Sequence, residues 1–472
     1  MYNSSKFERK LNSILMYSLE KSKYNLSMSA ITALAHIYYE KNQEYRNDCL
    51  EEALQKIKCE LKGRYCKKYN SKKNVVLFYD GMGQDTRGLA LTYLKAISKY
   101  SDKIVYVTNE RVRYKQPILA EFLASCNASI EYLSETTSHM ARLNQIMSII
   151  EDYCPSDGFL YTLPYDTSGV LAFMLAEQLT RYQIDFTDHA FWIGVNAFDF
   201  CVEFRNYGVT IATQYRNIER KKMILLPFYP RINTIDFKGF DFETTGKKVI
   251  FSGGSLYKTF SEDRLFYKIV DHLLSNVNDA IFYYVGSGDK REIYNLMSTH
   301  PNRVFYSDER EDFFEVMKKS TIYLNTYPLL GGLMTQYAVA AGKVPITLLH
   351  DQDGTGFLIN AENTGVFYND TSSLLKDTIK LLSNKEYLKK RENSLTNCLM
   401  TESKFEEEIG SILIKQKGTL EITTMEIDLS RIHEEYLTRF SPKAVVDAIA
   451  KMRNKPLLCY FPVLFFKRKF RR

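Results

Sequence analysis

The chain has 472 residues, of which 45% are hydrophobic and 25% are charged. That composition is typical of a folded globular protein, and the length predicts two or three domains, because single cores rarely grow beyond ~250–300 residues. The net charge of +7 belongs to the C-terminal end, where residues 451–472 carry eight basic side chains and no acid. The rest of the chain is close to neutral, which argues against a general nucleic-acid-binding surface.

The sequence shows no targeting or metal-binding signal. No run reaches the ~18 apolar residues that a membrane-spanning helix needs, and residues 1–13 lack the apolar core of a signal peptide. The eight cysteines form no CxxC pair, so neither a zinc site nor a disulfide framework is expected. These features predict a protein of the reducing cytoplasm without a bound metal.

The first 72 residues are predicted to form a helical extension. Their apolar residues recur at spacings of three and four between charged ones, which is the period of an amphipathic helix. Two interpretations remain open. Residues 1–70 either pack against the body as an appendage or form a module that binds a protein partner.

Residues 73–236 are predicted to form a first α/β domain. The apolar strand 74–80, the glycine-rich loop 81–88, a helix and the strand 103–110 make a βαβ unit. Gly81 and Gly83 do not give the GxGxxG spacing of a dinucleotide site, but they follow a strand, where α/β domains bind ligands. Further expected elements are a strand at 128–134, a helix at 140–152, a strand at 158–166 that ends on Asp166, a helix at 168–182 and a strand starting near 208.

A histidine with an adjacent acid lies in the stretch 183–204. Asp188 and His189 precede Trp192, the only tryptophan of the chain. A carboxylate beside a histidine fixes its tautomer and raises its basicity, so this pair is a candidate general base. The alternative is a core histidine that is hydrogen-bonded to the backbone.

Residues 237–420 are predicted to form a second α/β domain, with the boundary at about 232–247. The strand 248–252 runs into Gly253 and Gly254, which let a backbone approach a diphosphate, and Lys258 supplies a cation. A strand at 280–289 ends near Gly286. Residues 303–320 are expected to form a strand, an acidic loop and a helix.

The stretch 321–347 predicts a strand, a glycine turn at Gly331 and Gly332, a helix from Leu333 to Ala341 and another strand. A helix that starts at a glycine turn offers free backbone N–H groups to a phosphate. Thr335 and Gln336 in its first turn are candidate side-chain donors. The alternative is an ordinary strand–helix joint of an α/β sheet.

This order of motifs resembles the GT-B glycosyltransferases over residues 73–420. The most specific pieces are SGGSLYK at 252–258, YPLLGGLMTQYAVAAGKVPIT at 327–347 and TDHAFWIG at 187–194. The resemblance implies two Rossmann-like domains facing each other across a cleft, with a nucleotide-diphosphate sugar, expected to be a UDP-sugar, as donor and no cofactor. It implies donor contacts from Gly253, Gly254, Lys258, Gly286, Tyr306, Asp308, Gly331, Gly332, Thr335 and Gln336. His189 and Asp188 would be catalytic together with Lys258, and the acceptor-side candidates are Gly81, Gly83, Asp166 and Trp192.

The chain departs from the pattern of many retaining members, which carry two glutamates around the last helix. Leu329 and Tyr337 stand at those positions. This departure favours an inverting enzyme, or a divergent branch that resembles bacterial protein O- or N-glucosyltransferases and capsule transferases. Residues 351–353 spell DQD, but a polar turn explains them better than a metal site. We therefore expect single displacement, with a base on the acceptor hydroxyl and Lys258 on the departing diphosphate.

Residues 421–472 are predicted to form a C-terminal helix and a tail. The apolar run 456–466 is bracketed by basic clusters, which favours an interfacial anchor on anionic lipid, although packing onto the body is the alternative. The anchor predicts a cytoplasmic enzyme that is peripheral on the inner face of a bacterial membrane. It would act on a glycan, lipid-linked or protein acceptor in cell-surface polysaccharide or glycoprotein synthesis. Two other functions stay open, a non-catalytic subunit that stabilises a partner transferase and a nucleotide-sugar epimerase.

Overall fold

A computed structural model describes the chain in two compact units. The first holds residues 1–226 and 403–472, and the second holds residues 227–402. The described residues are 4–65, 70–85, 89–232, 235–349, 356–361, 364–451 and 455–461. In this division residues 227–236 belong to the second unit and residues 403–420 to the first, whereas the sequence placed the two boundaries at 236 and 420.

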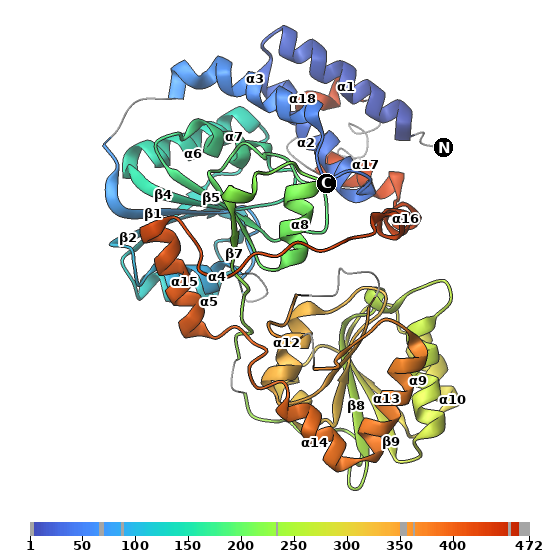
Figure 1. The fold of residues 1–472 in the computed structure, drawn as a ribbon. Coiled ribbons are helices and arrows are strands. Elements are labelled where there is room, and N and C mark those ends of the chain that lie inside the picture. Colours follow the sequence, from blue (N-terminus) through green and yellow to red (C-terminus); the bar gives the residue numbers. More distant parts are fainter. Residues whose placement is uncertain are drawn as a thin grey trace. The chain divides into compact units, whose positions relative to one another are not determined.

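The first unit is built on a parallel sheet of seven strands (Figure 1). The strand order in this sheet is β3-β2-β1-β4-β5-β6-β7. The order of addition reverses between β1 and β4, since β2 and β3 lie on one side of β1 and β4 to β7 on the other. The strands are β1 (Lys72–Asp80), β2 (Lys103–Asn109), β3 (Ala128–Leu133), β4 (Pro155–Tyr161), β5 (Thr180–Asp185), β6 (Phe200–Glu203) and β7 (Met223–Leu225). The central strand β1 is buried from Val75 to its end, as a strand covered on both faces must be.

Helices connect these strands. They are α4 (Ala90–Ile97), η1 (Glu110–Val112), α5 (Pro117–Ala124), α6 (His139–Tyr153), α7 (Thr167–Leu175), α8 (Asn206–Gln214) and η2 (Arg220–Lys222). Polar side chains set two helix starts: Ser138 Oγ accepts from Ala141 N at 3.1 Å, and an Asp166 carboxylate oxygen accepts from Gly169 N at 3.1 Å.

Three sequence predictions in this unit were wrong. The helix expected at 168–182 ends at Leu175, and the strand β5 begins at Thr180. The strand expected near 208 is the helix α8, because β-branched residues do not prevent a helix. A Cβ on Gly208 would lie 2.2 Å from Glu203 Oε2, so this helix approaches the end of β6 closely. The strand expected to reach Asp166 ends at Tyr161.

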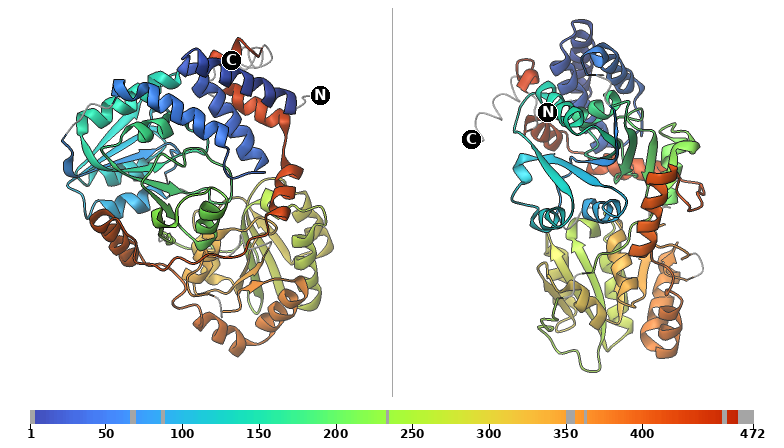
Figure 2. Two further views of the ribbon diagram at one scale, coloured as in Figure 1. Left: turned by 45° about the horizontal axis from the view of Figure 1, so that its top comes forward. Right: turned by 90° about the vertical axis from the view of Figure 1, so that its left-hand side faces the viewer.

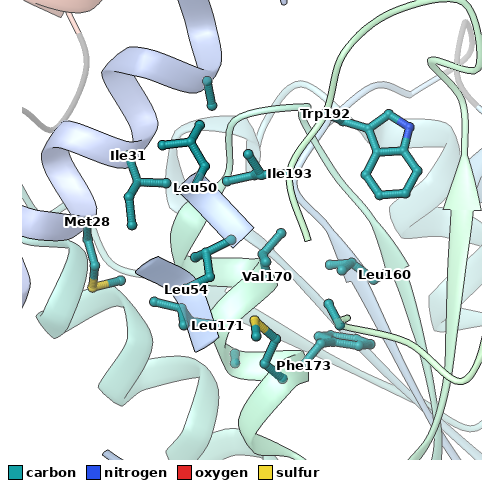
Figure 3. Close-up of a cluster of buried hydrophobic side chains, with 14 of the residues drawn as sticks. Met28, Ile31, Leu50, Leu54, Leu160, Val170, Leu171, Phe173, Trp192 and Ile193 are labelled. Atoms are coloured by element: carbon teal, nitrogen blue, oxygen red, sulfur yellow. The ribbon is translucent and has the colours of Figure 1, made fainter. Parts of the chain in front are cut away.

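The N-terminal helices are part of the core of the first unit. They are α1 (Ser4–Glu20), α2 (Tyr24–Lys41) and α3 (Asp48–Tyr65). Residues Met28 to Ile37 of α2 are buried, and the cluster they join includes strands, α6 and α7. Figure 3 shows Ile31, Leu50 and Leu54 beside Val170 and Ile193. Residues 4–65 are therefore integral to the unit.

C-terminal helices join the same unit. They are α15 (Glu402–Lys415), α16 (Leu429–Arg439), α17 (Pro442–Lys451) and α18 (Lys455–Leu458). The ring of Phe405 lies 5.2 Å from that of Tyr93 in α4, which explains why α15 groups with the first sheet. The helices α17 and α18 contact α2, and the views of Figure 2 show red C-terminal helices beside the blue N-terminal ones.

The second unit has a parallel sheet of six strands in the order β10-β9-β8-β11-β12-β13. Its elements are β8 (Lys248–Ser255), η3 (Leu256–Thr259), α9 (Leu265–Asn276), β9 (Ala280–Ser287), α10 (Arg291–Thr299), β10 (Val304–Ser307), α11 (Phe313–Lys319), β11 (Ile322–Leu324), α12 (Gly332–Ala340), β12 (Pro345–Leu348), β13 (Phe367–Tyr368), α13 (Thr371–Ser383) and α14 (Lys385–Asn393). Two parallel α/β sheets confirm the predicted fold class.

The described part of the C-terminal tail packs on the first unit. Leu457 is fully buried and Phe461 is 8% exposed. The Phe461 ring lies 4.7 Å from that of Phe7, and Lys10 Nζ donates to Tyr460 O at 2.6 Å. These residues are thus not available to enter a lipid surface, and the rest of the apolar run and the basic residues 467–472 lie outside the described residues. No helix within the described ranges is long and apolar enough to span a membrane.

Candidate functional site

Each sheet has a point where the strand order reverses, and α/β domains bind ligands at the carboxyl ends of the strands there. In the second unit this point lies between β8 and β11, and in the first between β1 and β4. Lys258 follows the end of β8, and Gly331 lies between β11 and α12. Gly81 follows β1, and Asp166 follows β4. The topology thus places predicted residues from separate sequence motifs at each of the two reversal points.

Lys258 is a half-buried cation at the end of η3. Burial lowers the pKa of its ammonium group. Within the described ranges it forms no ion pair, while its backbone carbonyl accepts from Leu329 N at 3.3 Å. That bond ties the segment carrying Lys258 to the loop that precedes α12. A half-buried ammonium group without a carboxylate is suited to bind an anionic ligand.

The strand expected at 248–252 is longer in the structure, because β8 continues through Gly253 and Gly254 to Ser255. Gly254 pairs with Gly286 of β9. A Cβ on Gly286 would lie 1.9 Å from the Gly254 carbonyl oxygen, so the close approach of the strands requires a glycine there. Gly254 has φ +127° and open space where a Cβ would be. The open space beside Gly254 is compatible with a diphosphate, whose binding here stays a prediction.

Asn325, which the sequence analysis missed, organises the start of α12. Its Oδ1 accepts from Gly331 N at 2.9 Å, and its Nδ2 donates to Thr335 Oγ1 at 2.9 Å and to Thr347 Oγ1 at 3.3 Å. The residue is 4% exposed. Asn325 therefore fixes the glycine turn and leaves the next N–H groups, from Gly332 to Met334, with no acceptor among the residues that the structure describes. The signal in the sequence that could have identified Asn325 is its place directly after an apolar strand.

The first turn of α12 uses its side chains internally. Gln336 Nε2 donates to Phe228 O at 3.0 Å and to Phe357 O at 2.9 Å, and Thr335 Oγ1 donates to Gly331 O at 3.0 Å. A Cβ on Gly332 would lie 2.2 Å from the Phe357 ring. Thr335 and Gln336 are buried and position the helix, so the donors left for a ligand are backbone N–H groups.

Tyr306 and Asp308, predicted to meet the base, form a surface group at the end of β10. Tyr306 hydroxyl donates to Gly286 O at 2.5 Å and lies 2.9 Å from an Asp308 oxygen. Lys290 Nζ donates to the same Asp308 oxygen at 2.9 Å, and this bond lowers the pKa of Asp308. Lys290 was not singled out from the sequence, because it lies on a different segment.

In the first unit, Asp80 shapes the loop that contains Gly81 and Gly83. Its Oδ1 accepts from Met82 N at 2.9 Å and from Gly83 N at 2.8 Å. A Cβ on Gly81 would lie 2.0 Å from Thr162 Oγ1, so the loop approaches the end of β4 closely. Asp166, besides capping α7, accepts from the hydroxyls of Tyr79 and Thr162, each at 2.7 Å. These contacts give Asp166 a structural role in this unit.

His189 is held beside Asp188, as the sequence predicted, but Asp188 has a stronger partner. His189 Nδ1 lies 3.3 Å from Asp188 Oδ1, and Arg205 donates to both oxygens of Asp188, at 2.6 and 2.9 Å. Burial raises the pKa of Asp188, but Arg205 and His189 outweigh this and hold that pKa below its usual value. Asp188 is fully buried, whereas the His189 side chain is 39% exposed. Asp188 is therefore a fixed carboxylate that orients His189, and it is not itself accessible as a base.

A buried charge cluster lies behind this pair. Arg216 Nη2 donates to the carbonyls of Thr187, Asp188 and Ala190, and Trp192 Nε1 donates to Asp185 Oδ2 at 2.9 Å. Trp192 is 3% exposed, so it supports the loop from within and presents no free face to an acceptor. Burial raises the pKa of Asp185 and that of Glu203.

Within the described ranges, no group of three or more acidic, histidine or cysteine side chains is arranged to hold a metal ion. The DQD residues 351–353 lie outside those ranges. The candidate site residues of the second unit are Lys258, glycines and backbone amides. The candidate of the first unit is His189, which Asp188 holds in place. This set offers electrostatic binding of an anion and acid–base chemistry.

Solved structures share this fold at low sequence identity. An O-GlcNAc transferase point mutant from Thermobaculum terrenum aligns with TM-score 0.52 and 11% identity over 91% of this chain and 82% of that chain. A glycosyltransferase from Rickettsia africae aligns with TM-score 0.52 and 14% identity over 74% and 100%. A structure assigned to UDP-N-acetylglucosamine 2-epimerase from Listeria monocytogenes aligns with TM-score 0.50 and 12% identity over 75% and 100%. No family model and no curated protein sequence matches the chain.

Proposed function

Because the chain has the two-domain GT-B fold, we propose that it is a glycosyltransferase that uses a nucleotide-diphosphate sugar, with UDP as the expected nucleotide. The observation that carries the proposal is Lys258. This half-buried cation has no carboxylate partner among the described residues and lies at the reversal point of the second sheet. The N-terminus of α12 supplies backbone donors to the same strand-end region.

The proposed reaction is a single displacement. His189, oriented by Asp188, takes the proton of an acceptor hydroxyl, and the hydroxyl oxygen attacks the anomeric carbon of the donor sugar. The bond from that carbon to the diphosphate breaks, and Lys258 with the α12 amides stabilises the nucleoside diphosphate that leaves. Lys258 and His189 belong to different units, so each role is tested by itself.

UDP binding is the first test. Ligand that binds the folded state raises the melting temperature by mass action, so we expect UDP to stabilise the protein. Lys258→Ala removes a charge-assisted contact and should weaken UDP binding by about 10- to 100-fold. Lys268→Ala, which removes an exposed lysine from α9 of the same unit, is the matched control and should bind UDP as the native chain does. Equal UDP affinity of the two variants would refute the role of Lys258.

Product analysis separates the transferase from its alternatives. Release of UDP and of free or transferred sugar from a UDP-sugar supports the transferase. Conversion to an isomeric UDP-sugar, suggested by the likeness to the Listeria structure, would make the protein an epimerase. Tight UDP binding without any turnover would favour a non-catalytic subunit of a partner transferase.

Attachment to an anionic membrane surface is the part of the proposal that rests on sequence alone. The cluster at residues 467–472 contains five basic residues, and each contributes about 1 kcal/mol near an anionic surface. Sedimentation with phosphatidylglycerol vesicles, but not with phosphatidylcholine vesicles, is expected for the full chain. A chain that ends at residue 461 should lose this binding, and unchanged binding would overturn the proposal.

A further inference from the structure

The loop that carries His189 is fastened by side chains from the N-terminal helices. Asn42, at the end of α2, donates from Nδ2 to His189 O at 2.9 Å and accepts at Oδ1 from Phe191 N at 2.9 Å. Glu51 Oε1, from α3, accepts from Gly194 N at 2.8 Å. One buried amide and one buried carboxylate thus bind three backbone groups of a six-residue segment.

Packing reinforces these hydrogen bonds. The Tyr38 ring lies 5.5 Å from that of Phe191, and Figure 3 shows Leu50 next to Ile193. The connection between α2 and α3 also reaches the arginine behind the loop, because Arg46 donates to Arg216 O at 3.3 Å. The helices therefore hold residues 189–194 from one side, while Arg216 binds the carbonyls of the same loop.

The backbone of residues 189–194 is tightly constrained by its surroundings. Gly194 has φ +100°, and a Cβ there would lie 2.6 Å from Val170 Cγ1, so the chain turns tightly against α7. Most of the loop is buried, with Phe191 at 0% and Ile193 at 3% exposed. The His189 side chain is the partly exposed exception.

We infer that α2 and α3 are a positioning element for His189, in which Asn42 and Glu51 fix the backbone that presents the imidazole beside Asp188. The inference rests on the proposed function, because it takes His189 as the base. It gives residues 24–65 a role in the site of this chain. Asn42 and Glu51 are positioning residues, since they act through His189 and its neighbours.

The first experiment compares the two ends of α2. Asn42 has left-handed backbone (φ 44°), so Asn42→Gly removes the side chain without backbone strain. Asn25→Ala is the matched control, because Asn25 also joins α2 to the unit through two bonds, accepting from Ser138 Oγ and Met140 N, but binds α6 instead of the loop. Hydrogen exchange of residues 189–195 should be about 10-fold faster in Asn42→Gly and unchanged in Asn25→Ala.

Kinetics give the second readout. Asn42→Gly should lower kcat about 10-fold, because small displacements of a base are costly, and leave KM for the donor unchanged within about 2-fold. Asn25→Ala should leave both parameters unchanged. Equal effects of the two variants on exchange and on kcat would mean that the helices only stabilise the fold, and this result would overturn the inference.

A second pair of variants covers the case in which Asn42→Gly does not fold. Glu51→Gln keeps an oxygen that accepts from Gly194 N, whereas Glu51→Ala does not. The hydrogen-exchange rate of the Gly194 amide should therefore stay native in Glu51→Gln and rise in Glu51→Ala. Equal exchange in the two variants would also overturn the inference. Hydrogen exchange needs no substrate, so it tests the positioning role even if the protein has no transferase activity. Failure of the proposed function is recognised separately, because the native chain would then not bind UDP.

Discussion

The two strand-end regions differ in how their charges are balanced. Around Lys258 the described residues provide a cation, glycines and backbone amides without a compensating carboxylate. Around Asp188 the arginines are already matched, since Arg205 binds Asp188 and Arg216 lies 3.5 Å from Asp185. The first region is therefore suited to bind an anionic ligand. In the second region the charged side chains are already paired with one another, and they hold His189 in place. The comparison predicts that substitutions in the first region weaken binding, and those in the second affect chemistry or stability.

The largest expected effect comes from removing the histidine. His189→Gln should lower kcat by about 100- to 10,000-fold, the range typical of a general base, with UDP affinity unchanged. His272→Gln, a surface histidine of α9, is the control and should be silent. Parallel titrations of UDP and measurements of turnover check this prediction. Loss of UDP affinity in His189→Gln would break the division of roles between the two regions.

Asp188→Asn is expected to destabilise the protein by about 3–5 kcal/mol, because Arg205 would remain buried without its countercharge. Asp199→Asn removes the partner of Arg181, a carboxylate that is 39% exposed, and should cost no more than ~1 kcal/mol after solvent screening. Urea unfolding followed by circular dichroism measures both. Similar costs would show that the buried cluster is not balanced as the geometry indicates.

Glu51 predicts a pH dependence of stability. Burial raises the pKa of Glu51 from 4.5 to about 7, although Gly194 N and the nearby Arg46 oppose this, while Asp48 adds to it. The folded state therefore keeps the proton longer than the unfolded chain, and stability falls as the pH rises from about 4.5 through 7. Glu51→Gln removes this slope.

Unfolding free energies of Glu51→Gln and the native chain, measured at pH 5 and pH 8, check this prediction. The variant should gain up to ~3 kcal/mol relative to the native chain between these values, at 1.36 kcal/mol per pKa unit. Glu52→Gln, a neighbouring exposed carboxylate on α3, is the control. Parallel pH profiles for native chain and variant would place the Glu51 pKa near its usual value.

The smallest effect concerns the start of α12. Asn325→Ala leaves Gly331 N without its acceptor and should cost about 1–3 kcal/mol of stability, the penalty of an unsatisfied buried group. Loosening the α12 N-terminus should also weaken UDP binding, by less than Lys258→Ala does. Asn295→Ala, on the surface of α10, should change neither. Calorimetric titration with UDP ranks the three variants.

Sequence patterns predicted most of the parallel strands correctly. Apolar runs such as 74–80 and 280–287 indicate buried strands because both faces of a parallel sheet are covered, and the structure has β1 and β9 there. The helix α8 was missed because Val209, Thr210 and Ile211 favour strands as residues, although the segment lies as a helix. Local propensity is weak beside tertiary packing.

The candidate site was predictable only in part. The pair Asp188 and His189, and Lys258 after an apolar strand, are visible because each motif lies within a few residues. Arg205 and Asn325 were not found, since nothing local marks a side chain that bonds across the fold. Asn42 contacts His189 over a separation of 147 residues, and no periodicity carries that information.

The sequence by itself determined the fold class, the helical character of residues 4–65 and the order of most strands and glycine loops, because hydrophobic period, glycines and strand ends are local properties. Only the tertiary structure decided that Asp188 is committed to Arg205, that Gly253 and Gly254 lie within a strand, and that the N-terminal helices hold the loop of His189. Those outcomes depend on which distant groups are buried together, because a buried charge or amide must find a partner wherever the fold brings one.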